Sequence, residues 1–246
     1  MMQKEDVGIY STKKGMIAIE SPIKNRILQK LQERELTFEE LIEVCDKAKS
    51  TMSVHMNDLL DMGLIYKRVD PKDKRKKYYG INSDLIVSSR APISAHYNKI
   101  LQSVPSAMND RYDFLRSLFH LLRCGMESYG VDTSPALKKM GRDVGRMMAP
   151  KFRSTNAKDL LAEVAGFWKE QGLGTVEVVK GDVPTILVYD CFDCNTMPNV
   201  GRTQCSLDEG MLEAIIEEKL KVRCSIEETE CHGTGHQHCK FIIKIF

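Results

Sequence analysis

The sequence predicts an α+β protein built in two parts, and three observations lead to this prediction. Apolar residues before residue 65 recur at helical spacing, whereas those after Gly172 alternate as in strands. Basic residues are concentrated in one early segment. Six of the eight cysteines lie after residue 190. With 246 residues, of which 42% are apolar and 28% charged, and a formal net charge of +2, the composition excludes a disordered chain.

The sequence also predicts a cytoplasmic protein with no membrane partner. A spanning helix needs about 18 consecutive apolar residues, and the chain offers only short runs such as residues 16–19. We find no charged-then-apolar signal sequence at its start. In the cytoplasm, cysteines serve more often as reduced thiols, metal ligands or redox sensors than as a disulfide framework.

Three helices are predicted before residue 65. Apolar residues between Ile23 and Leu31 share one helical face. Thr37 and Glu40 have the spacing of a capping box, which predicts the start of a short second helix. The apolar stripe of the third helix ends at Gly63, a residue suited to a left-handed helix end.

A basic hairpin is predicted to follow, with strands at residues 64–69 and 78–81. The segment from residue 64 to 80 carries seven basic side chains, Lys67, Arg68, Lys72, Lys74, Arg75, Lys76 and Lys77, against Asp70 and Asp73. Such a segment attracts a polyanion. A helix, a helix-turn-helix pair and a basic hairpin in this order describe a winged helix-turn-helix, in which the second helix of the pair enters the DNA major groove.

Two groups of residues are therefore expected to contact a double-stranded DNA operator. Those near the start of the third helix can reach base edges: Lys49, Ser50, Thr51, Ser53 and Val54. Those of the hairpin can neutralise phosphates: Arg68, Lys72, Lys74, Arg75 and Lys76. The alternative is a protein-docking module made of the same elements.

This region resembles the ArsR-type archaeal and bacterial repressors over roughly residues 20–85. The resemblance is carried by the run at residues 49–56, by Gly63-Leu64-Ile65 and by Lys76-Lys77-Tyr78-Tyr79. The chain departs from that family in having no cysteine pair at the start of the recognition helix, so metal sensing is not implied there.

The middle of the chain, residues 92–152, is predicted to be helical, with an apolar surface too wide for one packing seam. Because operators are read by symmetric dimers, we expect part of this segment to join two subunits of a homodimer; ordinary packing within one chain is the alternative. Cys124 is expected to be a buried small residue. The expected domains are a winged helix-turn-helix at residues 1–90, a linker or dimerisation helix at 91–110 and a sensor domain at 111–246.

The C-terminal part is predicted to be an α+β domain with an antiparallel sheet. Its expected elements are a helix at 156–172, a hairpin around 176–189 that turns at Lys180-Gly181-Asp182, a helix at 207–220, and two last strands at 222–231 and 239–245. If a five-residue loop closes the last hairpin, Cys231 and Cys239 become cross-strand neighbours.

Two thiols at that separation can bind zinc or form a disulfide. Cys205, just before the helix at 207–220, is a third candidate ligand. Spacing does not choose the fourth ligand, for which the candidates are Glu228, His232, His236 and His238. Glu228 would need a β-bulge to face the same way as Cys231.

The series Cys205, then Glu228-x2-Cys231-x7-Cys239-x-Phe241, resembles the 4-vinyl reductase domain over roughly residues 110–246. The domain is found also in phenol-sensing bacterial activators. The resemblance implies that Cys205, Glu228, Cys231 and Cys239 hold a zinc ion, with a structural or redox-linked role.

Three further cysteines lie outside that series. Cys191 and Cys194 form a C-x-x-C pair after a strand, and Cys224 lies on a later strand. They are either buried small residues or redox-sensing thiols that oxidise to disulfides or sulfenic acids. A winged helix joined to this domain, with extra cysteines, resembles the methanogen-specific redox-responsive regulators (MsvR type). That resemblance implies a repressor whose DNA contact depends on thiol state.

The sequence thus predicts a dimeric DNA-binding transcription regulator. Its control is expected to come from thiol oxidation, or from exchange of zinc-bound thiolate for disulfide, in the C-terminal domain. The alternative is a regulator that binds a small hydrophobic or aromatic ligand in that domain. We find no phosphate-binding loop, nucleophile elbow or open metal site in the sequence, so catalysis is not expected.

Overall fold

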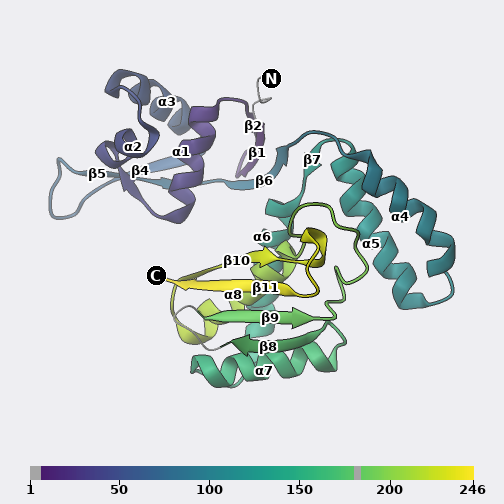
Figure 1. Cartoon of the computed structure of the whole chain (residues 1–246). Helices are drawn as coiled ribbons and strands as arrows, with labels where there is room; N and C mark the ends of the chain where they lie inside the picture. The colour runs from purple at the N-terminus through teal and green to yellow at the C-terminus, as the bar shows by residue number, and fades with distance from the viewer. Residues whose placement is uncertain (1–6, 180–183) are drawn as a thin grey trace. The chain divides into compact units, whose positions relative to one another are not determined.

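Helices and antiparallel strands occur in both of the units into which the chain divides after Arg90, which confirms the α+β class (Figure 1). The structure is a computed structural model and describes residues 7–179 and 184–246. Within these ranges, no helix combines the length and the apolar character needed to cross a membrane.

The first unit contains the three predicted helices and the predicted hairpin. These are α1 (Pro22–Glu33), α2 (Phe38–Cys45), α3 (Lys49–Asp61), β4 (Ile65–Val69) and β5 (Lys77–Ile81), with the short β3 (Leu36–Thr37) pairing with β5. The apolar stripes that predicted the helices supply the core, in which Ile27, Leu41 and Leu59 are fully buried. Gly63 follows α3 with a φ of 73°, the left-handed conformation expected at this helix end.

Three strands of this unit were not predicted. They are β1 (Gly8–Thr12), β2 (Gly15–Ile19) and β6 (Asp84–Ser89), and β1 pairs antiparallel with both of the others. Tyr10 on β1 is 1% exposed, and its hydroxyl lies 3.1 Å from Oδ1 of Asn25 on α1. The pairing of β1 with β6 joins segments at opposite ends of the unit, so no local pattern announces it.

The predicted capping box is present at the start of α2. The Glu40 N–H donates to Oγ1 of Thr37 over 3.3 Å, and the Thr37 N–H donates to Oε2 of Glu40 over 2.7 Å. This backbone hydrogen bond, together with those from Arg34 and the Thr37 hydroxyl, lowers the pKa of Glu40 from 4.5 to about 2. The box fixes the first helix of the helix-turn-helix pair.

We expect Thr37→Ala to lower the stability of the first unit by about 1 kcal/mol, since it removes an N-cap side chain. The Glu40 pKa is lower in the folded state, so its stabilising contribution is present above about pH 4.5 and is lost as the pH falls from there toward 2. Thermal unfolding of the full chain between pH 2 and 7 measures both effects. Ser53→Ala, an exposed change within α3, is the control. Equal unfolding midpoints for the two variants at pH 7 would contradict the expectation.

The second unit is built on a four-stranded antiparallel sheet in the order β10-β11-β9-β8. Its strands are β8 (Thr175–Val179), β9 (Thr185–Tyr189), β10 (Cys224–Glu230) and β11 (Cys239–Ile245). The other elements are α4 (Ser94–Ala107), α5 (Arg111–Ser128), β7 (Val131–Asp132), α6 (Ser134–Met148), a 3-10 turn (Ala149–Lys151), α7 (Ala157–Glu170) and α8 (Ser206–Leu220). The predicted turn at Lys180-Gly181-Asp182 lies outside the described residues.

Helix α8 is held between α6 and the sheet (Figure 1), and the seven successive residues from Gly210 to Ile216 are buried. Glycines allow α6 and α8 to approach closely, because a Cβ on Gly141 would lie 2.1 Å from the Leu207 carbonyl oxygen. Ion pairs join the same helices, with Nζ of Lys138 and Nη1 of Arg142 each 2.7 Å from the Glu213 carboxylate. These contacts position the start of α8, where Cys205 lies.

Candidate functional site

Five buried cysteines and one buried glutamate meet in the second unit, at the ends of β9, β10 and β11 and at the start of α8. They form two overlapping sets of four donors, and within each set all donor atoms lie within 4.8 Å of one another. The first set is Cys205, Glu228, Cys231 and Cys239, and the second is Cys191, Cys194, Cys205 and Cys239.

The last hairpin brings Cys231 and Cys239 together, as predicted. Cys231 follows β10 and Cys239 begins β11, with their Sγ atoms 3.9 Å apart. The connection between them is longer than the five residues expected, because it spans residues 232–238 and includes a 3-10 turn (His232–Thr234). The Cys231 N–H donates to Oγ1 of Thr234 over 2.8 Å, which closes this turn.

Glu228 faces the cysteines through the β-bulge that the sequence required. The register of β10 on β11 shifts between Glu228 and Glu230. One carboxylate oxygen, Oε2, accepts the N–H groups of Gln204 and Cys205 over 2.9 and 2.8 Å. The other, Oε1, is buried and has no hydrogen-bond partner among the described residues. Burial, and next the negative charge of Cys231, raise the pKa of Glu228 to about 8.

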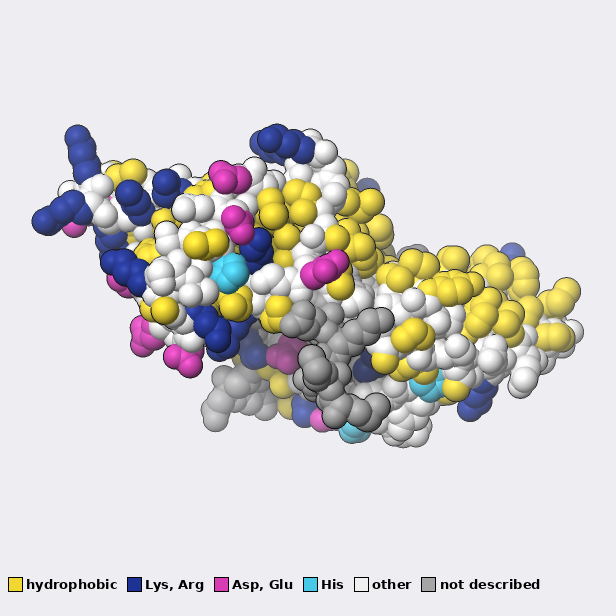
Figure 2. Space-filling view, turned by 90° about the horizontal axis from the view of Figure 1, so that it is seen from above, with side chains coloured by type: hydrophobic (Ala, Val, Ile, Leu, Met, Phe, Trp, Pro, Cys, Tyr) yellow, Lys and Arg dark blue, Asp and Glu magenta, His cyan; other side chains and the backbone are white. Residues whose placement is uncertain are grey.

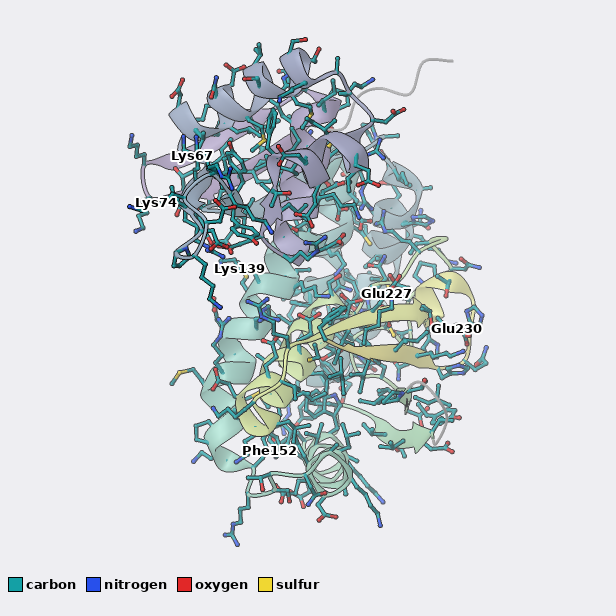
Figure 3. All side chains as sticks on the ribbon, turned by 90° about the vertical axis from the view of Figure 1, so that its left-hand side faces the viewer. Lys67, Lys74, Lys139, Phe152, Glu227 and Glu230 are labelled. Atoms are coloured by element: carbon teal, nitrogen blue, oxygen red, sulfur yellow. The ribbon has the colours of Figure 1, made fainter. Side chains whose placement is uncertain are left out.

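The three histidines that competed with Glu228 in the sequence lie outside both sets of donors in the described part of the chain. Nε2 of His238 lies 2.9 Å from Oε2 of Glu230, and Nδ1 of His236 lies 2.9 Å from Oγ1 of Thr234. Figure 3 labels Glu230 at the end of β10. Nε2 of His232 is buried and meets no hydrogen-bond partner within the described residues.

The C-x-x-C pair joins the same cluster, which the sequence analysis did not predict. Sγ of Cys194 lies 3.1 Å from Sγ of Cys239, and Sγ of Cys191 lies 3.9 Å from Sγ of Cys205. Hydrogen bonds from Cys194 and then Cys205 lower the pKa of Cys191. The two cysteines therefore touch residues that the sequence assigned to a metal ion.

Cys224 does not join the cluster. It begins the seven-residue strand β10, about 20 Å along the strand from Cys231. Its thiol donates to the carbonyl oxygen of Glu213 over 3.7 Å, and burial raises its pKa to about 12. The three cysteines that the sequence grouped as redox-sensing thus have two different surroundings.

The first set of donors fits a zinc ion. A tetrahedral ion with metal–sulfur bonds of about 2.3 Å places its sulfur ligands about 3.8 Å apart. The Sγ atoms of Cys205 and Cys239 are 3.6 Å apart, and those of Cys231 and Cys239 are 3.9 Å apart. The unpartnered Oε1 of Glu228 supplies the fourth donor. Because these residues are buried, the site has the closed character of a structural centre.

Charged residues of α5 hold the loops that carry the cysteines. Arg123 is 6% exposed, with Nη2 2.8 Å from Oδ2 of Asp193 and Nη1 3.5 Å from Oε1 of Gln204. Nε2 of His120 meets the Asp193 carbonyl oxygen, and Nη1 of Arg116 donates to Oδ1 of Asn195 over 3.0 Å. Sequence analysis missed these residues, since Arg123 and Asp193 are 70 positions apart. The available signal was the presence of charges on an otherwise apolar helix.

The ten predicted DNA-contacting residues are all exposed on α3 and the β4–β5 hairpin. Figure 2 shows Lys and Arg side chains gathered around this hairpin, and Figure 3 labels Lys67 on its strand and Lys74 at its tip. Arg68 differs from the other nine, because its guanidinium forms a bidentate ion pair with the Glu35 carboxylate. Its carbon Cζ also lies 4.6 Å from the centre of the Tyr78 ring.

Comparison with known proteins assigns a family to both units. Residues 21–67 match the model of the bacterial regulatory protein, arsR family, and residues 184–245 match the model of the 4-vinyl reductase domain. These matches define the class: a DNA-binding transcription regulator, rather than an enzyme, that joins an ArsR-type helix-turn-helix to a 4-vinyl reductase domain. Two relatives from Methanocaldococcus jannaschii, the uncharacterized proteins MJ0150 and MJ1642, are each 30% identical over 131 residues. The match covers 52% of this chain and 75% and 76% of the relatives. The chain belongs to the family of these two archaeal proteins.

Solved structures were compared as well. A vinyl-4-reductase family protein from Methanocaldococcus jannaschii has a TM-score of 0.40 and 15% identity, covering 63% of this chain and 98% of that one. The phenol-responsive sensory domain of the transcription activator PoxR, solved with phenol, has a TM-score of 0.36 and 16% identity, covering 77% of this chain and 90% of that one.

Proposed function

We propose that the protein is a homodimeric repressor whose affinity for its operator changes with the oxidation state of the thiol cluster. The observation that carries this proposal is the contact between Cys194 and Cys239, whose Sγ atoms are 3.1 Å apart. One of these cysteines belongs to the donor set that fits zinc, and the other lies in a loop held by α5. A change at this contact therefore acts on both.

In the reduced state, Cys205, Glu228, Cys231 and Cys239 would hold a zinc ion. The ion would keep the three thiols deprotonated and tie α8 to the last hairpin. The protein prepares the site by holding Oε2 of Glu228 with two backbone N–H groups. Those bonds leave Oε1 directed to the cluster.

Oxidation would join Cys194 to Cys239. The oxidant is a peroxide: its O–O bond breaks, an S–S bond forms, and the two thiol protons end in two molecules of water. The sulfur atoms must approach from 3.1 Å to about 2.05 Å, which requires a small movement of the loop after β9. Cys239 then ceases to be available as a metal ligand.

Helix α5 would carry this change to a subunit interface. Asp193 immediately precedes Cys194 and is bound by Arg123 of α5. The other side of α5 exposes apolar side chains, namely Leu115, Leu118, Phe119, Leu122 and Met126. Figure 2 shows apolar side chains gathered over the α4–α5 end of the second unit. A patch of this kind marks an interaction surface, and we assign it to the homodimer contact.

A dimer would present two α3 helices to half-sites one DNA turn apart. Lys49, Ser50, Thr51, Ser53 and Val54 would read base edges. Lys72, Lys74, Arg75 and Lys76 would neutralise phosphates. Arg68, which pairs with Glu35, would chiefly hold the hairpin in place.

The test compares operator affinity in the two redox states. With DNA selected in vitro by the full-length protein, we expect peroxide to change the Kd at least tenfold, about 1.4 kcal/mol, and dithiothreitol to restore it. Disulfides typically supply about 2–4 kcal/mol each, so two per dimer suffice. Fluorescence anisotropy titrations measure the change.

Cys194→Ser should abolish this response. Cys224→Ser, a change of a buried cysteine outside the cluster, should retain it. Equal affinities in the two redox states, or a full response in Cys194→Ser, would overturn the proposal.

A further inference from the structure

Cys205 and Cys239 belong to both sets of donors. What differs between the sets is the second pair: Glu228 and Cys231 in one, Cys191 and Cys194 in the other. The first set offers three sulfur atoms and a carboxylate oxygen. The second offers four sulfur atoms. One cluster therefore presents two ligand environments of different softness around a shared pair of thiols.

We propose that this cluster binds metal ions in two modes, chosen by the softness of the ion. Zinc, a borderline ion, takes Glu228 and Cys231 with the shared pair, whereas a soft thiophilic ion such as cadmium takes Cys191 and Cys194. This inference rests on the zinc set of the proposed function. The new site is the all-sulfur one.

Charge does not separate the two modes, but donor type does. Each set carries four negative charges when its donors are deprotonated, so a divalent ion leaves the same net charge of about −2 in either mode. Soft ions favour thiolate over carboxylate oxygen. The four cysteines of the all-sulfur set are at most 3% exposed, so the neighbouring donors are sulfur rather than water. A soft ion thus gains a fourth sulfur by exchanging Glu228 and Cys231 for Cys191 and Cys194, whose thiol protons pass to the solvent.

The two modes bind different parts of the fold. The zinc set ties the start of α8 to β10 and β11. The all-sulfur set ties the same helix and β11 to the loop after β9. Asp193 lies between Cys191 and Cys194 in this loop and pairs with Arg123 of α5. A soft metal ion would therefore act on the loop that α5 holds, as an input separate from peroxide.

The test counts sulfur ligands for each metal in the full-length, reduced protein. The metal-free protein is loaded with zinc or with cadmium-113, and X-ray absorption at each metal edge and the cadmium-113 chemical shift report the donors. We expect three sulfurs and one oxygen around zinc, and four sulfurs around cadmium. The comparison needs no variant, so a folding defect cannot obscure it. Three sulfurs and one oxygen around cadmium, or four sulfurs around zinc, would overturn the selection by softness.

Variants assign the ligands. The double variant Cys191→Ser/Cys194→Ser should lose the four-sulfur cadmium signature and keep the zinc environment. Glu228→Gln should alter the zinc environment and keep four sulfurs around cadmium. Cys224→Ser should change neither, and circular dichroism verifies that each variant is folded. Four sulfurs around cadmium in the double variant would overturn the assignment. These readouts involve no DNA, so loss of the redox response with an intact four-sulfur cadmium site would refute the proposed function alone.

Discussion

Cys239→Ser is expected to lose at least nine tenths of the bound metal and to melt about 10 °C below the wild type. Cys239 is shared by both donor sets, and its Sγ lies within 3.9 Å of those of Cys194, Cys205 and Cys231. A structural zinc ion contributes directly to folding free energy. Losing about 4 kcal/mol of it would lower the Tm of a domain of this size by roughly 8–16 °C.

Elemental analysis and thermal unfolding of the reduced protein measure these two effects. The matched control is Cys224→Ser, which changes another buried cysteine of the same sheet. A Cys239→Ser protein with its full metal content would show that the cluster holds no ion through this residue. An equal metal loss in Cys224→Ser would show that the effect reflects general destabilisation of the sheet.

The second large effect is expected at the β4–β5 hairpin. Replacing Lys72, Lys74, Arg75 and Lys76 with alanine should weaken operator binding about 100- to 1,000-fold at physiological salt. If each side chain neutralises one phosphate, the slope of log K against log salt concentration should become shallower by about 3.6, at roughly 0.9 per contact. The four side chains are exposed, so their removal should leave the core of the unit unchanged.

Anisotropy titrations at several salt concentrations measure this slope, in the redox state that binds DNA more tightly. A control with the same change in net charge replaces four exposed lysines of the second unit: Lys99, Lys151, Lys158 and Lys169. Its slope should stay near that of the wild type. An equal loss in the control would indicate that net charge, rather than the hairpin, determines affinity.

The helices of the first unit were predictable because their signals are local. The stripe from Ile23 to Leu31 and the pair Thr37 and Glu40 lie within one or two helical turns, and the structure confirms both elements. By contrast, β1 was not predicted, because its partner β6 lies more than 70 residues along the chain. A five-residue strand carries too little periodicity to be recognised without its neighbours.

The second unit shows the same division at the thiol cluster. The last hairpin is a local element, so the approach of Cys231 to Cys239 followed from the sequence, and so did the need for a bulge at Glu228. The arrival of Cys191 and Cys194 did not. It results from the strand order, in which β9 pairs with β11 so that Val188 lies opposite Cys239. Residues just after β9 are thereby placed beside the start of β11.

The sequence by itself determined the kinds of chemistry available: a basic hairpin beside a recognition helix, and thiols with one carboxylate in the last third of the chain. Only the tertiary structure decided which of these groups share a site. It joined the C-x-x-C pair to the candidate zinc ligands, left Cys224 apart, and brought Arg123 to Asp193. The physical reason is that spacing along a chain reports neighbours within a turn or a hairpin. Contacts between distant segments depend on sheet order and helix packing, which the whole core settles together.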